Sequence, residues 1–179
     1  IGDIIKSGAV SIKVEGRMKK PEYVAAVIST YRRAIDNYID HGCTGITSKD
    51  EKSLLMAFNR GGFTTAHMFN KGGAEMMSIE RPKNWGVYIG NINKVCKNKN
   101  EMEITLEDEL SKGDGIEIWT KNGDNPGFIV EYILIKGRHV ESGKAGDKAV
   151  LEYRGGEKGD RVYKTMDKSF VKSLHKTYT

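Results

Sequence analysis

Short strand-like runs separated by turn residues fill the second half of this 179-residue chain, and they constrain its fold more than any other feature. The runs alternate apolar and polar residues or are rich in β-branched residues, as strands are. They cover residues 87–89, 102–106, 116–119, 128–135, 149–153 and 161–164. A Gly-Asp pair precedes three of them, at 113–114, 146–147 and 159–160, and supplies positive φ and an acceptor side chain for a tight reversal. We therefore predict a six-stranded antiparallel β-barrel, because closure removes exposed sheet edges.

The first 80 residues predict helices and an irregular connector instead. Pro21 suits the first turn of a helix, and apolar residues follow it at helical spacing, so we predict a helix over 21–40 that ends at His41-Gly42. The stretch Ser48-Lys49-Asp50-Glu51 fits a capping box at the start of a shorter helix. The periodicity is lost in residues 59–77, which we interpret as a connector. The fold class is therefore α+β, with one domain in residues 1–80 and a barrel domain in 81–179.

One strand-like run stands apart from the others. Residues 10–14 alternate apolar and polar side chains, but the neighbouring sequence offers them no partner strand. Because a lone strand is not stable by itself, we expect its partners in sequence outside this chain or in another chain. The chain also begins with Ile1 rather than Met. Both features favour a C-terminal piece of a longer protein.

Composition excludes some classes of protein. The net charge of +5 permits contact with a polyanion without demanding it. No run approaches 18 consecutive apolar residues, so a membrane-spanning helix and a membrane partner are not expected. The two cysteines, Cys43 and Cys96, cannot supply the four ligands of a structural zinc site or an iron–sulfur cluster, so we predict no metal or cofactor within the chain. Free thiols suit a reducing compartment, and we expect a cytoplasmic protein.

Two groups of residues are candidates for a functional site. Glu15 and Arg17 follow the run at 10–14, and in α/β barrels the carboxyl ends of strands form the catalytic rim. A structural ion pair is the alternative interpretation of these two. Arg154, Arg161 and Lys164 stand among tyrosines, a mixture typical of surfaces that bind nucleic acid. An ordinary solvated surface is the alternative there.

Three blocks resemble a known family. The first is SIKVEGRMKKPEYVAA at residues 11–26, the second is FNRGGFT at 58–64, and the third is PKNWGVYIG at 82–90. In this order they resemble the collagenase-like peptidases of unassigned catalytic type, the U-32 peptidase family. Two departures from the family pattern are an additional Gly in the second block and His67-Met68, shortly after that block, where family members tend to have Gly-Tyr.

The resemblance implies more than the spacing alone does. It implies that residues 1–80 end a catalytic TIM-like barrel and that the β-barrel is similar to the second domain of translation elongation factors. Glu15 and Arg17 match the first block, whereas Asn59 and Arg60 match the second, and we expect the latter pair to bind substrate together with Arg154, Arg161 and Lys164. The family's cysteine-rich motif, which in some members holds an iron–sulfur cluster, has no counterpart here. Such a cluster would belong to the missing part of the parent protein.

Three functions remain open at this point. The parent is a peptidase or hydrolase whose β-barrel orients a protein or peptide substrate. Alternatively, the barrel binds tRNA or rRNA for an enzyme that hydroxylates bases. The third alternative is a structural or dimerisation module, with a homo-oligomer as the partner. In each case we expect the parent to be the enzyme and this fragment to be inactive alone, because it offers no nucleophile with a base and no set of metal ligands.

Overall fold

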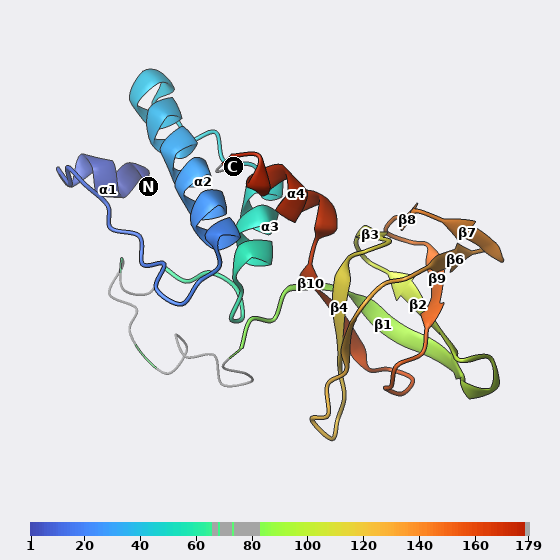
Figure 1. The fold of residues 1–179 in the computed structure, drawn as a ribbon. Helices are drawn as coiled ribbons and strands as arrows, with labels where there is room; N and C mark the ends of the chain where they lie inside the picture. The colour runs from blue at the N-terminus through green and yellow to red at the C-terminus, as the bar shows by residue number, and fades with distance from the viewer. Residues whose placement is uncertain (66–67, 69–72, 74–82, 178–179) are drawn as a thin grey trace. The chain divides into compact units, whose positions relative to one another are not determined.

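The computed structural model describes residues 1–65, 68, 73 and 83–177. It divides into two compact units, which are coloured along the chain in Figure 1. Unit 1 comprises Ile1–Phe58 and Phe170–Thr179, and unit 2 comprises Asn59–Ser169. Several residues of the predicted connector, among them Phe69, Met76 and Met77, lie outside the described residues, as does Pro82 of the third block.

Unit 1 is helical. Its helices are α1 (Gly2–Lys6), α2 (Pro21–His41), α3 (Ser48–Ala57) and most of α4 (Lys168–His175). The predicted helix over 21–40 is confirmed as α2: Pro21 stands in its first turn, and Gly42 ends it in the left-handed region at φ 73°. The Gly42 N–H donates to the Tyr38 carbonyl at 3.0 Å, which satisfies one of the terminal carbonyls.

The capping box of α3 lies one residue earlier than predicted. Thr47, rather than Ser48, is the N-cap. The Thr47 N–H donates to Asp50 Oδ2 at 2.9 Å, and the Asp50 N–H donates to Thr47 Oγ1 at 3.3 Å. Both Thr47 with Asp50 and Ser48 with Glu51 satisfy the sequence rule, so the pattern alone could not fix the register.

The predicted strand over residues 10–14 is wrong. Residues 9–16 have no regular secondary structure, and the side chain of Val10 is fully exposed at 100%. The physical reason is the one that made the run unusual in the sequence. Among the described residues no strand pairs with it, and an extended segment without ladder hydrogen bonds is not a strand.

Unit 2 is a curled antiparallel sheet. Eight of its strands form one sheet in the order β5-β4-β10-β1-β2-β9-β6-β7, and β3 pairs with β8 in a separate ribbon. The bounds are β1 Val87–Cys96, β2 Glu101–Leu106, β3 Leu110–Ser111, β4 Gly115–Trp119, β5 Gly127–Ile129, β6 Ile133–Ile135, β7 Arg138–Val140, β8 Ser142–Gly143, β9 Lys148–Glu152 and β10 Arg161–Met166. A 3-10 turn, η2 (Lys97–Lys99), follows β1.

The mixed α and β class is confirmed, but the closed six-stranded barrel is wrong. The two outer strands of the sheet, β5 and β7, do not pair with each other, so the sheet is open. The predicted run at 128–135 is also divided into β5 and β6. Val130, directly after β5, bonds to the turn before β4: the Val130 N–H donates to the Asp114 carbonyl, and the Gly113 N–H donates to the Val130 carbonyl, both at 2.8 Å.

The three Gly-Asp turns are confirmed, and they share one geometry. The glycines have φ of +93°, +92° and +93°. In each turn the Asp carboxylate accepts the backbone N–H three residues earlier, from Ser111, Lys144 and Glu157, at 2.8–2.9 Å. Each turn leads directly into β4, β9 or β10. Positive φ explains the Gly, and the acceptor geometry explains the Asp.

The core of unit 2 is a cluster of buried apolar side chains. Alternate side chains of β1, β2, β4, β9 and β10 fill it, and its largest fully buried members are Ile89, Ile92, Met102, Ile104, Leu106, Leu110, Ile116, Ile118, Ile133 and Leu151.

Among the described residues, no helix combines the length and the apolar character that a membrane crossing requires.

Candidate nucleic-acid interface

A polar pocket of about 300 Å³ lies where three connections of unit 2 meet. The connections are the turn η2, the β4–β5 loop and the β9–β10 loop. They contribute three cationic side chains, one each, namely Lys97, Lys121 and Arg154. Carboxylates also line the pocket, including those of Asp124 and Glu157. The pocket therefore offers both cations and acceptors to a ligand.

Local hydrogen bonds hold the loops that form the pocket. In the β4–β5 loop, the Thr120 hydroxyl lies 2.6 Å from Asn122 Oδ1 and 2.7 Å from the Asp124 carbonyl, and the Thr120 N–H donates to Asn125 Oδ1 at 2.9 Å. In the β9–β10 loop, the Tyr153 hydroxyl donates to the Gly156 carbonyl at 3.2 Å. These bonds fix the backbone of the two loops that carry Lys121 and Arg154.

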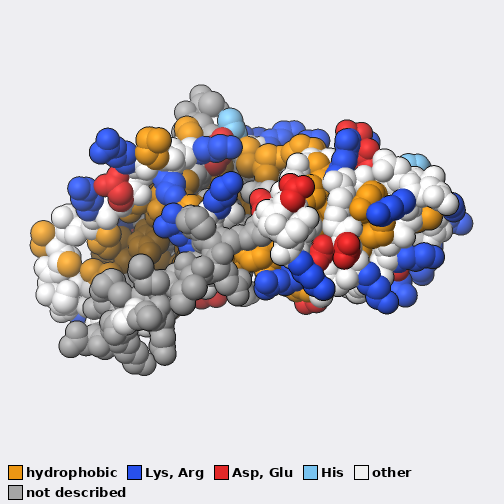
Figure 2. Space-filling model, turned by 90° about the horizontal axis from the view of Figure 1, so that it is seen from below, with side chains coloured by type: hydrophobic (Ala, Val, Ile, Leu, Met, Phe, Trp, Pro, Cys, Tyr) orange, Lys and Arg blue, Asp and Glu red, His pale blue; other side chains and the backbone are white. Residues whose placement is uncertain are grey.

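The three cations differ in their partners. Arg154 is half exposed, and its guanidinium lies 2.9 Å from Glu152 Oε2 and 3.9 Å from Glu131 Oε1. Lys97 and Lys121 are exposed and form no ion pair among the described residues. Figure 2 views the molecule from the side of these connections and shows blue Lys and Arg side chains around the sheet unit, with fewer red Asp and Glu. Exposed ion pairs contribute little, so an anionic ligand can compete for Arg154.

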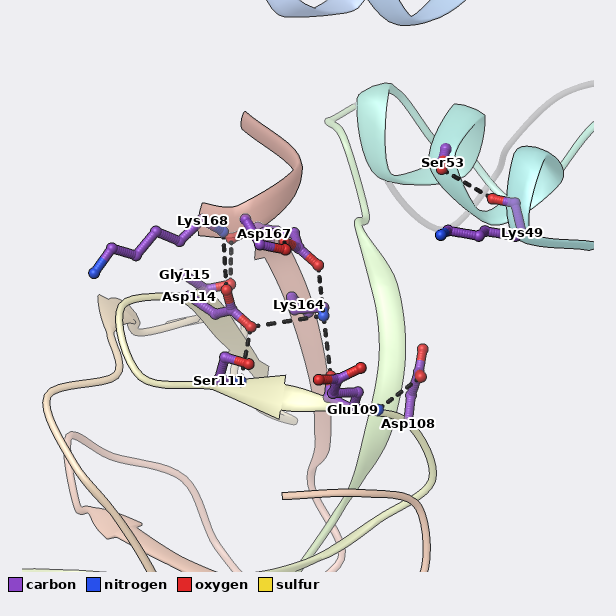
Figure 3. Close-up of polar contacts among 12 residues, drawn as sticks. Lys49, Ser53, Asp108, Glu109, Ser111, Asp114, Gly115, Lys164, Asp167 and Lys168 are labelled. Carbon is purple, nitrogen blue, oxygen red and sulfur yellow. Dashed lines mark hydrogen bonds and ion pairs between the residues drawn. The ribbon is translucent and has the colours of Figure 1, made fainter. Parts of the chain in front are cut away.

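Lys164, which we expect from the sequence to bind substrate, lies inside unit 2 instead of in this pocket. Its side chain is 3% exposed, and its Nζ donates to the Glu109 carbonyl and to Asp167 Oδ2, both at 3.0 Å (Figure 3). Asp114 Oδ2 lies 3.6 Å away. The Asp114 carboxylate also accepts the Lys168 N–H at 2.9 Å. Lys164 thus joins β10, the turn before β4 and the start of α4.

Arg161 lies beside a closed aromatic cluster. Its guanidinium carbon is 5.3 Å from the ring centroid of Trp119, which stacks on Tyr163 at 4.1 Å. Trp85 and Tyr88 extend the cluster at 5.1 Å and 5.6 Å. Trp119 is 7% exposed and Tyr163 is 6% exposed, so these two rings offer no free face on which a base could stack. In the sequence, basic and aromatic residues alternate here, and this alternation could not distinguish buried rings from exposed ones.

Asn59 organises a turn, whereas Arg60 is exposed. Asn59 Oδ1 accepts the N–H groups of Gly61 and Gly62 at 2.9 Å and 2.8 Å, and its Nδ2 donates to the Gly86 carbonyl at 2.6 Å. Asn84 Oδ1 accepts the Asn59 N–H at 2.8 Å. The structure therefore engages the side chain and the backbone N–H of Asn59 in hydrogen bonds within unit 2. These bonds do not bring Asn59 to the polar pocket.

Glu15 and Arg17 lie in unit 1. Glu15 Oε1 accepts the backbone N–H of Arg17 at 2.9 Å, and both residues are exposed. This contact involves the main chain of Arg17 and not its guanidinium, so it is a turn bond and no ion pair. Nearby in the sequence, Val10, Ile12 and Ile28 line an apolar groove of about 410 Å³. Figure 2 shows this part of unit 1 as a hollow with orange walls.

Lys97, Lys121 and Asp124 are the residues that sequence reasoning missed. They occupy turns, where charged residues are common and carry no periodic signal. Only the pairing of the strands brings these turns together. Within the described part of the chain, no group of three or more His, Cys, Asp or Glu side chains could hold a metal ion, and both cysteines are free thiols.

Comparison with known proteins identifies the first part of the chain. Residues 1–78 match the sequence profile of peptidase family U32. These residues belong to peptidase family U32. This match confirms the family resemblance and covers the first two sequence blocks, whereas the third block, at 82–90, lies beyond it.

Relatives of this chain carry different names. It is 30% identical over 159 residues to an uncharacterized protease of Methanocaldococcus jannaschii, covering 86% of this chain and 39% of that protein. It is 27% identical to the 23S rRNA 5-hydroxycytidine synthase of Escherichia coli, covering 68% of this chain and 19% of that protein. It is 28% identical to a tRNA hydroxylation protein of Bacillus subtilis, covering 74% of this chain and 32% of that protein. The chain thus spans two fifths or less of the length of these relatives.

Two solved structures are also similar to this chain. Both are crystal structures of the C-terminal domain of a U32 peptidase family protein from Geobacillus thermoleovorans, one of them the selenomethionine variant. Each has a TM-score of 0.41, at 11% and 12% identity. They cover 43% and 44% of this chain and 98% and 91% of their own chains.

Proposed function

We propose that unit 2 is the RNA-contacting domain of a U32 enzyme that hydroxylates tRNA or rRNA. The observation that carries the proposal is the meeting of Lys97, Lys121 and Arg154, from three separate connections, at one polar pocket. Phosphate contacts by Lys and Arg provide most of the affinity for nucleic acids without sequence preference. The names of two relatives, an rRNA hydroxycytidine synthase and a tRNA hydroxylation protein, support the same class of substrate.

In this proposal, residues 1–80 contribute the end of a TIM-like catalytic barrel and its connector, and residues 81–179 form the separate domain that resembles the second domain of elongation factors. The apolar groove along α2 supports the first part, because Ile28 and Ile39 are 48% and 65% exposed there. A chemical reaction would then require the remainder of the parent protein. Glu15, Arg17, Asn59 and Arg60 keep the roles that the family resemblance implies, as proposals.

A peptidase is the second candidate. The relative that matches 86% of this chain is an uncharacterized protease, and β5 is an outer strand whose Ile129 is 50% exposed. An outer strand can pair with an extended peptide. In that case the domain would orient a protein substrate. A third role, as a dimerisation module, predicts a mass that rises with concentration in light scattering.

A titration of the whole chain with transcribed tRNA tests the proposed function. Fluorescence anisotropy at several salt concentrations should give a dissociation constant of ~10⁻⁴ to 10⁻⁶ M near physiological salt that weakens steeply as salt rises. A gelatin-cleavage assay with the same preparation tests the second candidate. Absence of RNA binding at low salt, or gelatin cleavage that scales with the chain's concentration, would contradict the RNA proposal.

A further inference from the structure

The pocket at the three connections has a mixed chemistry that a simple phosphate clamp does not need. Two ammonium groups, on Lys97 and Lys121, have no ion-pair partner among the described residues. The same walls carry the exposed carboxylates of Asp124 and Glu157, for which no ion pair is formed in the described structure either. A ligand that fills this pocket must therefore present an anionic group and hydrogen-bond donors together.

One class of ligand combines these features. A ribonucleotide carries a phosphate for the lysines and hydroxyl or amino donors for the carboxylates. Acidic side chains accept hydrogen bonds from ribose hydroxyls and from base amino groups in many nucleotide sites. Inorganic phosphate or a sulfated surface would leave the carboxylates facing like charge, which is unfavourable.

The size of the pocket limits the ligand further. A volume of about 300 Å³ lies at the lower end of small-ligand sites and is suited to a single nucleotide unit rather than a stack of bases. Bases in an RNA duplex are stacked and paired, and the groove that could be read is too narrow for side chains. Sequence-specific proteins therefore bind unpaired, splayed nucleotides. The closed aromatic cluster cannot supply an alternative stacking platform, since Trp119 and Tyr163 are buried.

We infer that this pocket binds one unstacked ribonucleotide of a single-stranded RNA, with Lys97 and Lys121 on its phosphates and Asp124 on the ribose 2′-hydroxyl or a base amine. The inference rests on the proposed function and adds a binding site to it. The 2′-hydroxyl is the group that lets a protein distinguish RNA from DNA at one position. The pocket should therefore prefer RNA to DNA of the same sequence.

The test compares four forms of the whole chain: wild type, the double variant Lys97→Ala/Lys121→Ala, Asp124→Ala, and the control Lys148→Ala. Lys148 is an exposed lysine at the start of β9 and does not line the pocket. Each form is titrated with a fluorescein-labelled single-stranded RNA and with the DNA of the same sequence, over a range of salt. Tryptophan fluorescence verifies that each variant is folded.

The double variant should bind RNA about tenfold more weakly or worse, the equivalent of losing one or more charge-assisted hydrogen bonds. Its slope of log affinity against log salt should fall by about 1.4, since each phosphate contact to a single strand contributes about 0.7. Asp124→Ala should bring the affinities for RNA and DNA closer together, and Lys148→Ala should change neither. If all variants bind RNA as wild type does, the pocket assignment fails while the proposed function stands. If wild type binds no RNA, both fail.

Discussion

Lys164 Nζ lies 3.0 Å from Asp167 Oδ2; Lys164 belongs to β10, the last strand of unit 2, and Asp167 stands between β10 and α4. The side chain of Lys164 is 3% exposed and that of Asp167 is 23% exposed. With Asp114, which is 1% exposed, they form a charge cluster inside unit 2. Buried charges are stable only when they are paired and hydrogen-bonded, so each member should depend on the others.

Replacing Lys164 with Met should destabilise unit 2 by about 3–5 kcal/mol, because the substitution leaves two carboxylates without their cation. Urea unfolding followed by tryptophan fluorescence measures the change, and both tryptophans, Trp85 and Trp119, belong to unit 2. The matched control is Lys148→Met on the exposed surface of β9. A loss below about 0.5 kcal/mol, the usual range for surface substitutions, would show that the cluster is not needed for stability.

The repeated turns make a second prediction. Asp160 is 5% exposed and accepts the Glu157 N–H at 2.8 Å. Asp160→Ala should cost about 1–3 kcal/mol, since it leaves that N–H without its acceptor. Asp160→Asn keeps an acceptor oxygen and should cost clearly less. Equal losses for the two variants in urea unfolding would mean that the turn does not depend on this hydrogen bond.

A variant of Asn59 can distinguish whether this residue stabilises unit 2 or binds substrate. Its side chain makes three hydrogen bonds within unit 2, to the backbone of Gly61, Gly62 and Gly86. Asn59→Ala should therefore lower the free energy of unfolding by about 1–3 kcal/mol. The exposed Lys83 provides a nearby control as Lys83→Ala. A variant at Asn59 that keeps full stability but loses RNA affinity would instead favour the role that the family resemblance implies.

The capping box gives a pH dependence. The Thr47 backbone N–H, then the Thr47 hydroxyl and the Arg33 guanidinium, lower the pKa of Asp50 from 3.8 to about 2. Because the folded-state pKa is the lower one, its contribution to stability is fully present above about pH 4 and is lost as the pH falls towards 2. Carboxyl-detected NMR should follow this titration. Thr47→Ala should raise the pKa and cost about 1 kcal/mol, whereas Ser48→Ala, one residue on, should do neither.

The sequence predicted local features better than their assembly. The Gly-Asp turns and the ends of α2 follow from glycine conformation, proline and side-chain acceptors, which act over a few residues. The two alternative capping boxes around Thr47 and Ser48 are one residue apart, so local rules could not choose between them. The run at 128–135 was predicted as one strand because no local sequence signal indicates that Val130 bonds to the distant turn before β4.

The candidate site depended on long-range pairing and was therefore only partly predictable. Arg154 was found because it stands beside tyrosines, whereas Lys97 and Lys121 join it only through the register of β1, β4 and β9. Lys164 looked equivalent to Arg161 in the sequence. The alternation of strand faces turns Lys164 inward and leaves Arg161 exposed.

Mapping RNA onto the folded chain by NMR tests the central claim most directly. In a titration of the nitrogen-15-labelled chain with a short single-stranded RNA, backbone amide signals of Lys97, residues 120–125 and residues 153–157 should shift. Those of the hairpin formed by β6 and β7, which also carries a cation in Arg138, should stay in place. Shifts confined to other surfaces of unit 2, or none at saturating RNA and low salt, would contradict the account.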